Sequence, residues 1–127
     1  MVEFKSTENG ATISFYIARH WDEEIEFLVE VKTPFGSAKA TVSTYFTGSP
    51  VLFFQSMAIE WKGWKKDKAW NDLEDRVMLT ARSDSTAHTK LTVKLCEHES
   101  GFQTILVFEA GRLHEMAKEI ATLLPQP

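Results

Sequence analysis

One expected hairpin turn brings an imidazole close to a carboxylate. Arg82, Asp84 and His88 flank the turn over residues 83–86. A carboxylate next to an imidazole can orient it for proton transfer, which makes His88 a weak candidate for a catalytic residue. Aspartate is also a common turn residue, because its side chain bonds to nearby backbone groups. This structural role is the better supported of the two.

The other residues that could do chemistry show no recognisable pattern. No two of the four histidines have H-x-x-x-H spacing, and Cys96 has no Cys-x-x-Cys partner, so no zinc site is predicted. The chain also has no glycine-rich phosphate loop and no G-x-S-x-G nucleophile elbow. We therefore expect no metal and no cofactor, and the sequence leans toward a protein that is not an enzyme.

Three of the four tryptophans lie within ten residues, among four lysines. Trp61, Trp64 and Trp70 could stack on bases while the lysines met phosphates. However, Trp61 and Trp64 continue the three- and four-residue apolar spacing that begins at Phe53 and Met57, which is typical of a buried helical stripe. The net charge of -4 also disfavours nucleic acid as the main partner. We expect all three tryptophans to be structural anchors.

The elements that must position these residues are mostly strands, because two-residue alternation of apolar and polar side chains dominates the chain. The alternation is clearest over residues 24–32, where Phe27, Val29 and Val31 alternate with side chains that are polar except for Leu28. Five further segments alternate or are apolar on both faces: residues 12–17, 39–46, 76–82, 90–96 and 102–109. Six strands are therefore expected.

Apolar residues at three- and four-residue spacing predict two helices, residues 50–64 and 113–124. Each helix follows three strands, which predicts two similar halves, residues 11–64 and 74–124, within one domain of residues 1–127. The expected fold class is α+β. The strands would form one mainly antiparallel six-stranded sheet from two β-β-β-α units, with both helices on one face.

The uncovered face of such a sheet would be a candidate interaction face. It would carry separated acidic and basic side chains and one tyrosine: Glu26, Glu30, Tyr45, Arg76, Arg82, Lys90 and Lys94. This pattern favours a non-enzymatic module that binds another protein, for example an immunity or antitoxin-like protein that blocks a toxin. One alternative is a small-ligand binder or enzyme with a pocket near His88, Trp70 and Arg82. Another is a homodimer that uses apolar side chains of the same face.

Composition sets the broad class. A chain of 127 residues with 43% hydrophobic and 25% charged residues is typical of an ordinary globular domain. No apolar run approaches the roughly 18 residues of a membrane helix, and the N-terminus does not have the apolar segment of a signal peptide. A single cysteine is consistent with a reducing compartment. We expect a cytoplasmic protein without a membrane partner.

Three motifs resemble those of a family of small, largely actinobacterial proteins that form a domain of unknown function. The motifs are Trp61-x-Gly63-Trp64, Trp70-x-x-Leu73-Glu74 and Glu109-Ala110-Gly111-x-Leu113. The resemblance covers roughly residues 25–124 and implies a bacterial, single-domain protein, but it implies no mechanism. The family's usual Gly-His pair is replaced here by Ala87-His88, which weakens a turn-specific role for that position.

Overall fold

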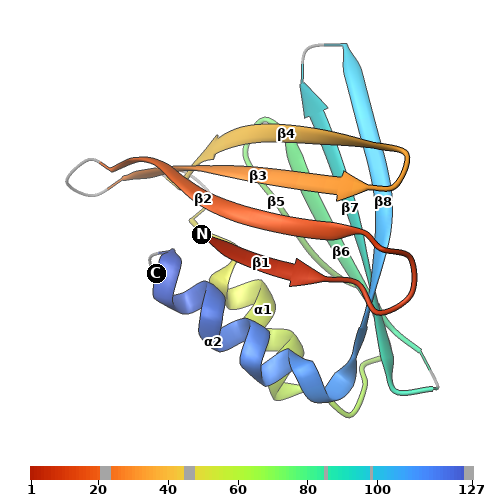
Figure 1. The fold of residues 1–127 in the computed structure, drawn as a ribbon. Coiled ribbons are helices and arrows are strands. Elements are labelled where there is room, and N and C mark those ends of the chain that lie inside the picture. Colours follow the sequence, from red (N-terminus) through yellow and green to blue (C-terminus); the bar gives the residue numbers. More distant parts are fainter. Residues whose placement is uncertain (21–23, 45–47, 85, 98, 125–127) are drawn as a thin grey trace.

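Two separate antiparallel sheets form most of the structure, a computed structural model that describes residues 1–20, 24–44, 48–84, 86–97 and 99–124 (Figure 1). Within these ranges the first sheet contains β1 (Val2–Lys5), β2 (Thr12–His20), β3 (Ile25–Thr33) and β4 (Gly36–Ser43). The second contains β5 (Lys68–Asn71), β6 (Val77–Ser83), β7 (His88–Glu97) and β8 (Ser100–Glu109). The helices are α1 (Val51–Ile59) and α2 (Leu113–Leu123), and a 3₁₀ turn, Ala110–Arg112, precedes α2.

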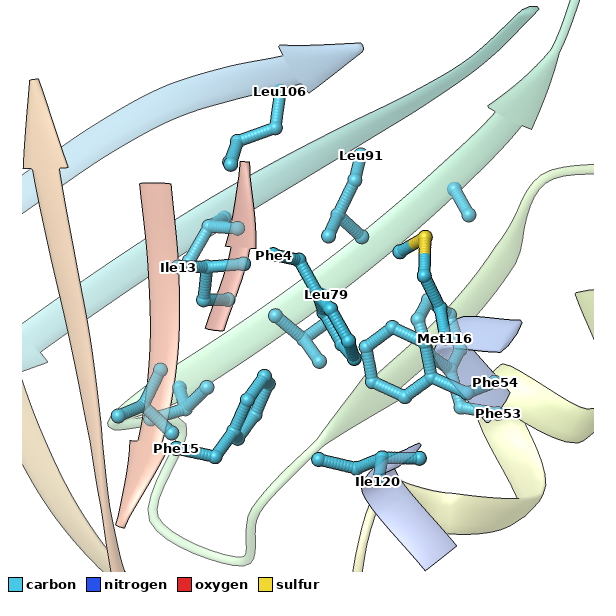
Figure 2. Close-up of a cluster of buried hydrophobic side chains, with 14 of the residues drawn as sticks. Phe4, Ile13, Phe15, Phe53, Phe54, Leu79, Leu91, Leu106, Met116 and Ile120 are labelled. Carbon is cyan, nitrogen blue, oxygen red and sulfur yellow. The ribbon is translucent and has the colours of Figure 1, made fainter. Parts of the chain in front are cut away.

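The two sheets lie face to face with their strands crossing, and the helices pack against each other at one end (Figure 1). α1 contacts β5 and α2 contacts β1, so each helix packs on the first strand of the other half of the chain. Figure 2 shows both sheets and both helices contributing to one core. Its labelled residues are Phe4, Ile13, Phe15, Phe53, Phe54, Leu79, Leu91, Leu106, Met116 and Ile120.

The predicted alternation is confirmed in the strands. In β3, Phe27, Val29 and Val31 are fully buried, whereas Glu26 and Glu30 on the opposite face are partly exposed. The same inward alternation places apolar residues of β6 and β7 in the core. Burying each such side chain stabilises the fold by about 1.5–3 kcal/mol, which fixes the face that each strand turns inward.

The prediction of one six-stranded sheet with both helices on one face is wrong. Alternation identifies one buried face for each strand, but it does not identify what covers that face. Here the other sheet is the main cover, because helices of nine and eleven residues are only about 14 and 17 Å long. The single open face implied by the prediction is therefore divided between the outer faces of two sheets.

Two strands are missing from the sequence-based prediction. β1 and β5 have four residues each, too few to establish a two-residue period. With them, each half of the chain has the order of four strands followed by a helix. This shared order is consistent with an internal repeat, but the predicted bounds 11–64 and 74–124 leave out both first strands. The repeat itself stays a prediction.

The turn between β1 and β2 covers the outer edge of β8. Ser6 is buried, and its Oγ accepts a hydrogen bond from the backbone N–H of Val107 at 2.9 Å. The N–H of Thr7 donates to the carbonyl of Val107 at 2.9 Å, and the amide of Asn9 donates to the carbonyl of Ile105. These bonds join the two sheets at one corner and satisfy edge groups that would otherwise lack partners.

Both helices agree only in part with their predicted ranges. The stripe of α2 is confirmed, since Leu113, Met116 and Ile120 are buried. α1 is shorter than predicted and ends at Ile59, because the chain leaves the helical path at Glu60. Trp61 and Trp64 therefore do not belong to the buried stripe of this helix.

Candidate functional site

The turn between β6 and β7 is organised by the carboxylate of Asp84. Its Oδ1 accepts hydrogen bonds from the hydroxyl of Thr86 at 2.8 Å and from the backbone N–H groups of Thr86 and His88 at 2.8 and 3.0 Å. The bond from the Thr86 hydroxyl, followed by those from the two N–H groups, holds the pKa of Asp84 below its usual value. Oγ1 of Thr86 also lies 2.9 Å from Nδ1 of His88.

This geometry favours a structural role for His88. A hydroxyl has one proton, so Thr86 cannot donate to Asp84 and to His88 at the same time. When Thr86 donates to Asp84, the imidazole must donate to Thr86 and cannot act as its base. Ala87 has a left-handed backbone with φ of 62°, and its carbonyl accepts from the N–H of Ala110 at 2.9 Å. The network thus stabilises a tight turn and ties it to the end of β8.

The residues expected around a catalytic or ligand pocket are not brought together. Trp70 pairs with Leu79 on the inner face of the second sheet, where its ring centroid lies 6.3 Å from that of Phe27. Arg82 and His88 alternate with buried neighbours and so belong to the outer face. The sheet itself separates Trp70 from Arg82 and His88.

The basic residues of the expected interaction face lie on the outside of the second sheet. Arg82 pairs with Lys90 across β6 and β7, and Lys94 lies further along β7. Arg82 donates from Nε and Nη2 to the two carboxylate oxygens of Asp67, both at 3.1 Å. These bonds hold the pKa of Asp67 below its ordinary value. Beside them is a shallow hollow of about 310 Å³, lined by Asp67, Thr80, Arg82, Lys90, Thr92 and Ile105.

The acidic residues of the expected face lie on the first sheet instead. Glu30 accepts a hydrogen bond from the Tyr16 hydroxyl at 3.4 Å and pairs with Lys32 at 3.7 Å. Glu26 is on the same face of β3. Arg76 reaches from the second sheet to the carbonyl of Thr41 at 3.5 Å. The predicted face is thus split between two sheets; Tyr45, its remaining member, lies outside the described residues.

Two of the three tryptophans pack against the core. Nε1 of Trp64 donates to the carbonyl of Ala81 at 3.2 Å, and the Lys68 ammonium lies 5.3 Å from the centre of the Trp64 ring. Lys68 also donates to Oγ of Ser56 at 2.6 Å and pairs with Glu60, so this junction holds α1 against β5. Trp70 packs against the core from β5.

Trp61 has a different environment and is 43% exposed. Leu52 and Ile59 of α1 are 57% and 80% exposed and lie seven residues apart, on one side of the helix, and Trp61 follows two residues after Ile59 in the chain. The rings of Trp61 and His114 meet edge to face with centroids 6.4 Å apart. Trp61, Ala110, Gly111 and His114 line a surface hollow of about 270 Å³. We call Leu52, Ile59, Trp61 and His114 the α1 surface.

The apolar part of this surface can be recognised in the sequence of α1. The nine residues of α1, VLFFQSMAI, include no charged side chain. A surface helix normally has a polar side facing solvent, and a helix that is apolar all round is covered on every side. Phe53, Phe54 and Met57 account for the core side of α1. Leu52 and Ile59 are the exposed apolar residues on the opposite side, which they share with the polar Gln55.

The described part of the chain offers no site for a resident metal. No group of three His, Cys, Asp or Glu side chains in these ranges could hold an ion. Cys96 is partly exposed and is not disulfide-bonded. Neither helix of the described residues has the length and apolar character to cross a membrane.

The comparisons with known proteins point to a family without an assigned activity. No curated protein and no solved structure matches the chain. The model of a family of unknown function, DUF6228, matches residues 4–127. The resemblance to a domain of unknown function is thereby confirmed, and the match extends it toward the N-terminus as far as residue 4, within β1. This chain belongs to the DUF6228 family.

Proposed function

We propose that this protein is a non-enzymatic binding module and that its α1 surface is covered by another protein. The observation that carries the proposal is a helix without charged residues that leaves Leu52 and Ile59 more than half exposed, next to a partly exposed Trp61. Large apolar side chains gathered on a surface favour association, because each Å² removed from water contributes about 25 cal/mol. Tryptophan is also enriched among the residues that dominate binding energy.

The hollow beside Trp61 suggests how such a partner would bind. At about 270 Å³ it is smaller than most drug-sized ligand sites, but an apolar side chain of a partner would fit there. The indole ring and the His114 imidazole would form one wall, and Gly111 adds no side chain that would narrow the hollow. The proposed contact is thus an apolar anchor from the partner, seated between the end of α1 and the start of α2.

The lysines that follow Trp61 in the chain indicate the chemistry of the partner. The Lys62 ammonium lies 5.7 Å from the centre of the Trp61 ring, and Lys65 and Lys66 follow in the same loop. Glu60 is already paired with Lys68, and no described carboxylate is within ion-pair distance of these three lysines. A partner that surrounds its apolar anchor with acidic side chains would complement this rim.

Two other readings are less well supported. The outer face of the second sheet is basic, but its described residues include no Phe, Tyr or Trp side chain on which a base could stack. The Asp84–Thr86–His88 network is occupied in holding a turn. An immunity or antitoxin-like role in a bacterial cytoplasm is the specific form of the proposal, and the partner would then be a toxin.

The test is affinity capture from the source organism with immobilised wild type and two variants. We expect one protein to be retained by wild type and by Leu73→Asp, and lost with Ile59→Asp. Leu73 is a matched control, since it is 63% exposed but lies outside the α1 surface. Lys62→Glu should weaken binding of the purified partner, and Trp61→Ala should weaken it by roughly 30-fold or more.

Three results would count against the proposal. They are the absence of any retained protein, equal retention by Ile59→Asp, and retention that nuclease treatment abolishes. Leu52, Ile59 and Trp61 are outside the core, so we expect the variants to keep the fold. Circular dichroism on each variant checks this.

A further inference from the structure

The four sheet edges are protected to very different degrees. The edge at β1 is covered by α2, and Arg112 donates to the carbonyl of Lys5 at 2.8 Å. The edge at β8 is covered by the turn that contains Ser6. β5 has four residues and is held against α1 through Lys68. β4 is eight residues long and lies at the open margin of the first sheet (Figure 1).

β4 also has few of the features that normally protect an edge. It contains no proline, its register with β3 runs without a bulge, and Lys39 is its single charged residue. Long, regular edge strands pair readily with another strand, which is why most proteins cover or distort them. Among the described residues, Arg76 makes one contact with this edge, at the carbonyl of Thr41.

The contact from Arg76 identifies which backbone groups point outward. The carbonyl of Thr41 faces away from β3, and in an antiparallel pair the N–H and C=O of one residue point to the same side. Alternate residues share this direction, so the backbone groups of Lys39 and Ser37 also point to the open edge. Their side chains lie on the outer face of the sheet, while Ala38 and Ala40 face inward.

A groove accompanies the first half of this edge. It has a volume of about 330 Å³ and separates β4 from the hairpin of β7 and β8, which crosses behind β4 and extends past it (Figure 1). The lining residues are Ser37, Ala38, Lys39, Leu95, Glu97, Ser100, Gly101 and Phe102. An added strand would therefore find apolar contacts for its inward-facing side chains as well as backbone partners.

We propose that β4 pairs antiparallel with β4 of a second copy of this chain, which joins the two first sheets into one continuous sheet. Of the registers that match outward-facing residues, we propose the one that places Ala40 opposite Ala40 of the second copy. Lys39 then faces Thr41, and Ser37 faces Ser43. No like charges are opposed, so the edge is complementary to itself. The inward Ala38 faces Val42 over the groove.

Thr41 provides a test in which two variants have opposite effects. Thr41→Glu places a carboxylate opposite Lys39 twice in each dimer, whereas Thr41→Lys opposes two ammonium groups twice. We expect sedimentation equilibrium to show a dimer whose dissociation constant falls roughly 2- to 30-fold with Thr41→Glu and rises by a similar factor with Thr41→Lys.

The two substitutions should change the stability of the single chain in the opposite direction to their effect on dimerisation. Thr41 lies opposite Leu28, so Glu26 and Glu30 are its diagonal neighbours on the same face. Lysine at this position is therefore favourable for the monomer, and glutamate is unfavourable. The expected gain in dimerisation with Thr41→Glu and the expected loss with Thr41→Lys therefore cannot result from changes in the stability of the monomer.

Two outcomes would overturn the inference. One is a monomer at every concentration that can be reached, and the other is a dimer that neither substitution affects. Ile59→Asp is expected to leave the dimer unchanged, which keeps this surface distinct from the α1 surface. A dimer that is lost with Ile59→Asp but insensitive to Thr41 would place self-association on α1 instead.

Discussion

Replacing Ser6 by alanine should destabilise the protein through one backbone group. The Ser6 Oγ accepts from the N–H of Val107 at 2.9 Å in a buried position, and this N–H has no other partner among the described residues. Alanine removes this acceptor from a buried position. An unsatisfied buried donor costs about 1–3 kcal/mol, so we expect the free energy of unfolding to fall by about 2 kcal/mol.

The matched control is Thr7→Val. The Thr7 hydroxyl donates to the carbonyl of Val107 at 3.1 Å, but that carbonyl also accepts from the Thr7 N–H, which the substitution retains. The expected loss is therefore below about 0.5–1 kcal/mol. Urea denaturation with an unchanged m-value measures both losses. Equal effects of the two substitutions, or no effect of Ser6→Ala, would refute the view that this turn closes the edge of β8.

Three further results follow from the structure. Trp64→Ala should cost about 3 kcal/mol in denaturant unfolding and Trp61→Ala about 1 kcal/mol or less, because Trp64 packs against the core and bonds to Ala81 while Trp61 is partly exposed. Asp84 has a lowered pKa in the fold, so its contribution to stability is present above its unfolded pKa near 4 and is lost as pH falls through the lower folded value. Thermal unfolding from pH 6 to pH 2 should therefore show a smaller acid-induced loss for Asp84→Asn than for wild type. Thr41→Glu and Thr41→Lys should shift the dimer equilibrium in opposite directions.

Local alternation allowed the strand faces to be predicted, but not how the sheets are arranged. The two-residue spacing of Phe27, Val29 and Val31 is enough to predict the buried face of β3. The helical spacing of Leu113, Met116 and Ile120 does the same for the buried face of α2. Whether one sheet or two results depends on pairing between β4 and β6 or its absence, which no local pattern encodes. The short strands β1 and β5 are formed by tertiary contacts with their neighbours and the helices rather than by their own periodicity.

The candidate site illustrates the same limit. The tryptophan spacing continues a helical period beyond Ile59, but the helix ends there, and Trp61 consequently points to the surface. His114 is 53 positions from Trp61 in the numbering, so their contact depends on how α1 and α2 pack. The absence of charge in α1 was readable from the sequence, whereas the hollow beside Trp61 was not.

Site-specific photocrosslinking in cells of the source organism tests most directly whether the α1 surface is the binding site. A photoreactive phenylalanine analogue would replace Ile59 in one strain and Leu73 in another. We expect one discrete adduct between this chain and a partner protein from position 59 and none from position 73. Adducts of equal yield from both positions, or none from position 59, would contradict the proposal that the α1 surface is the binding site.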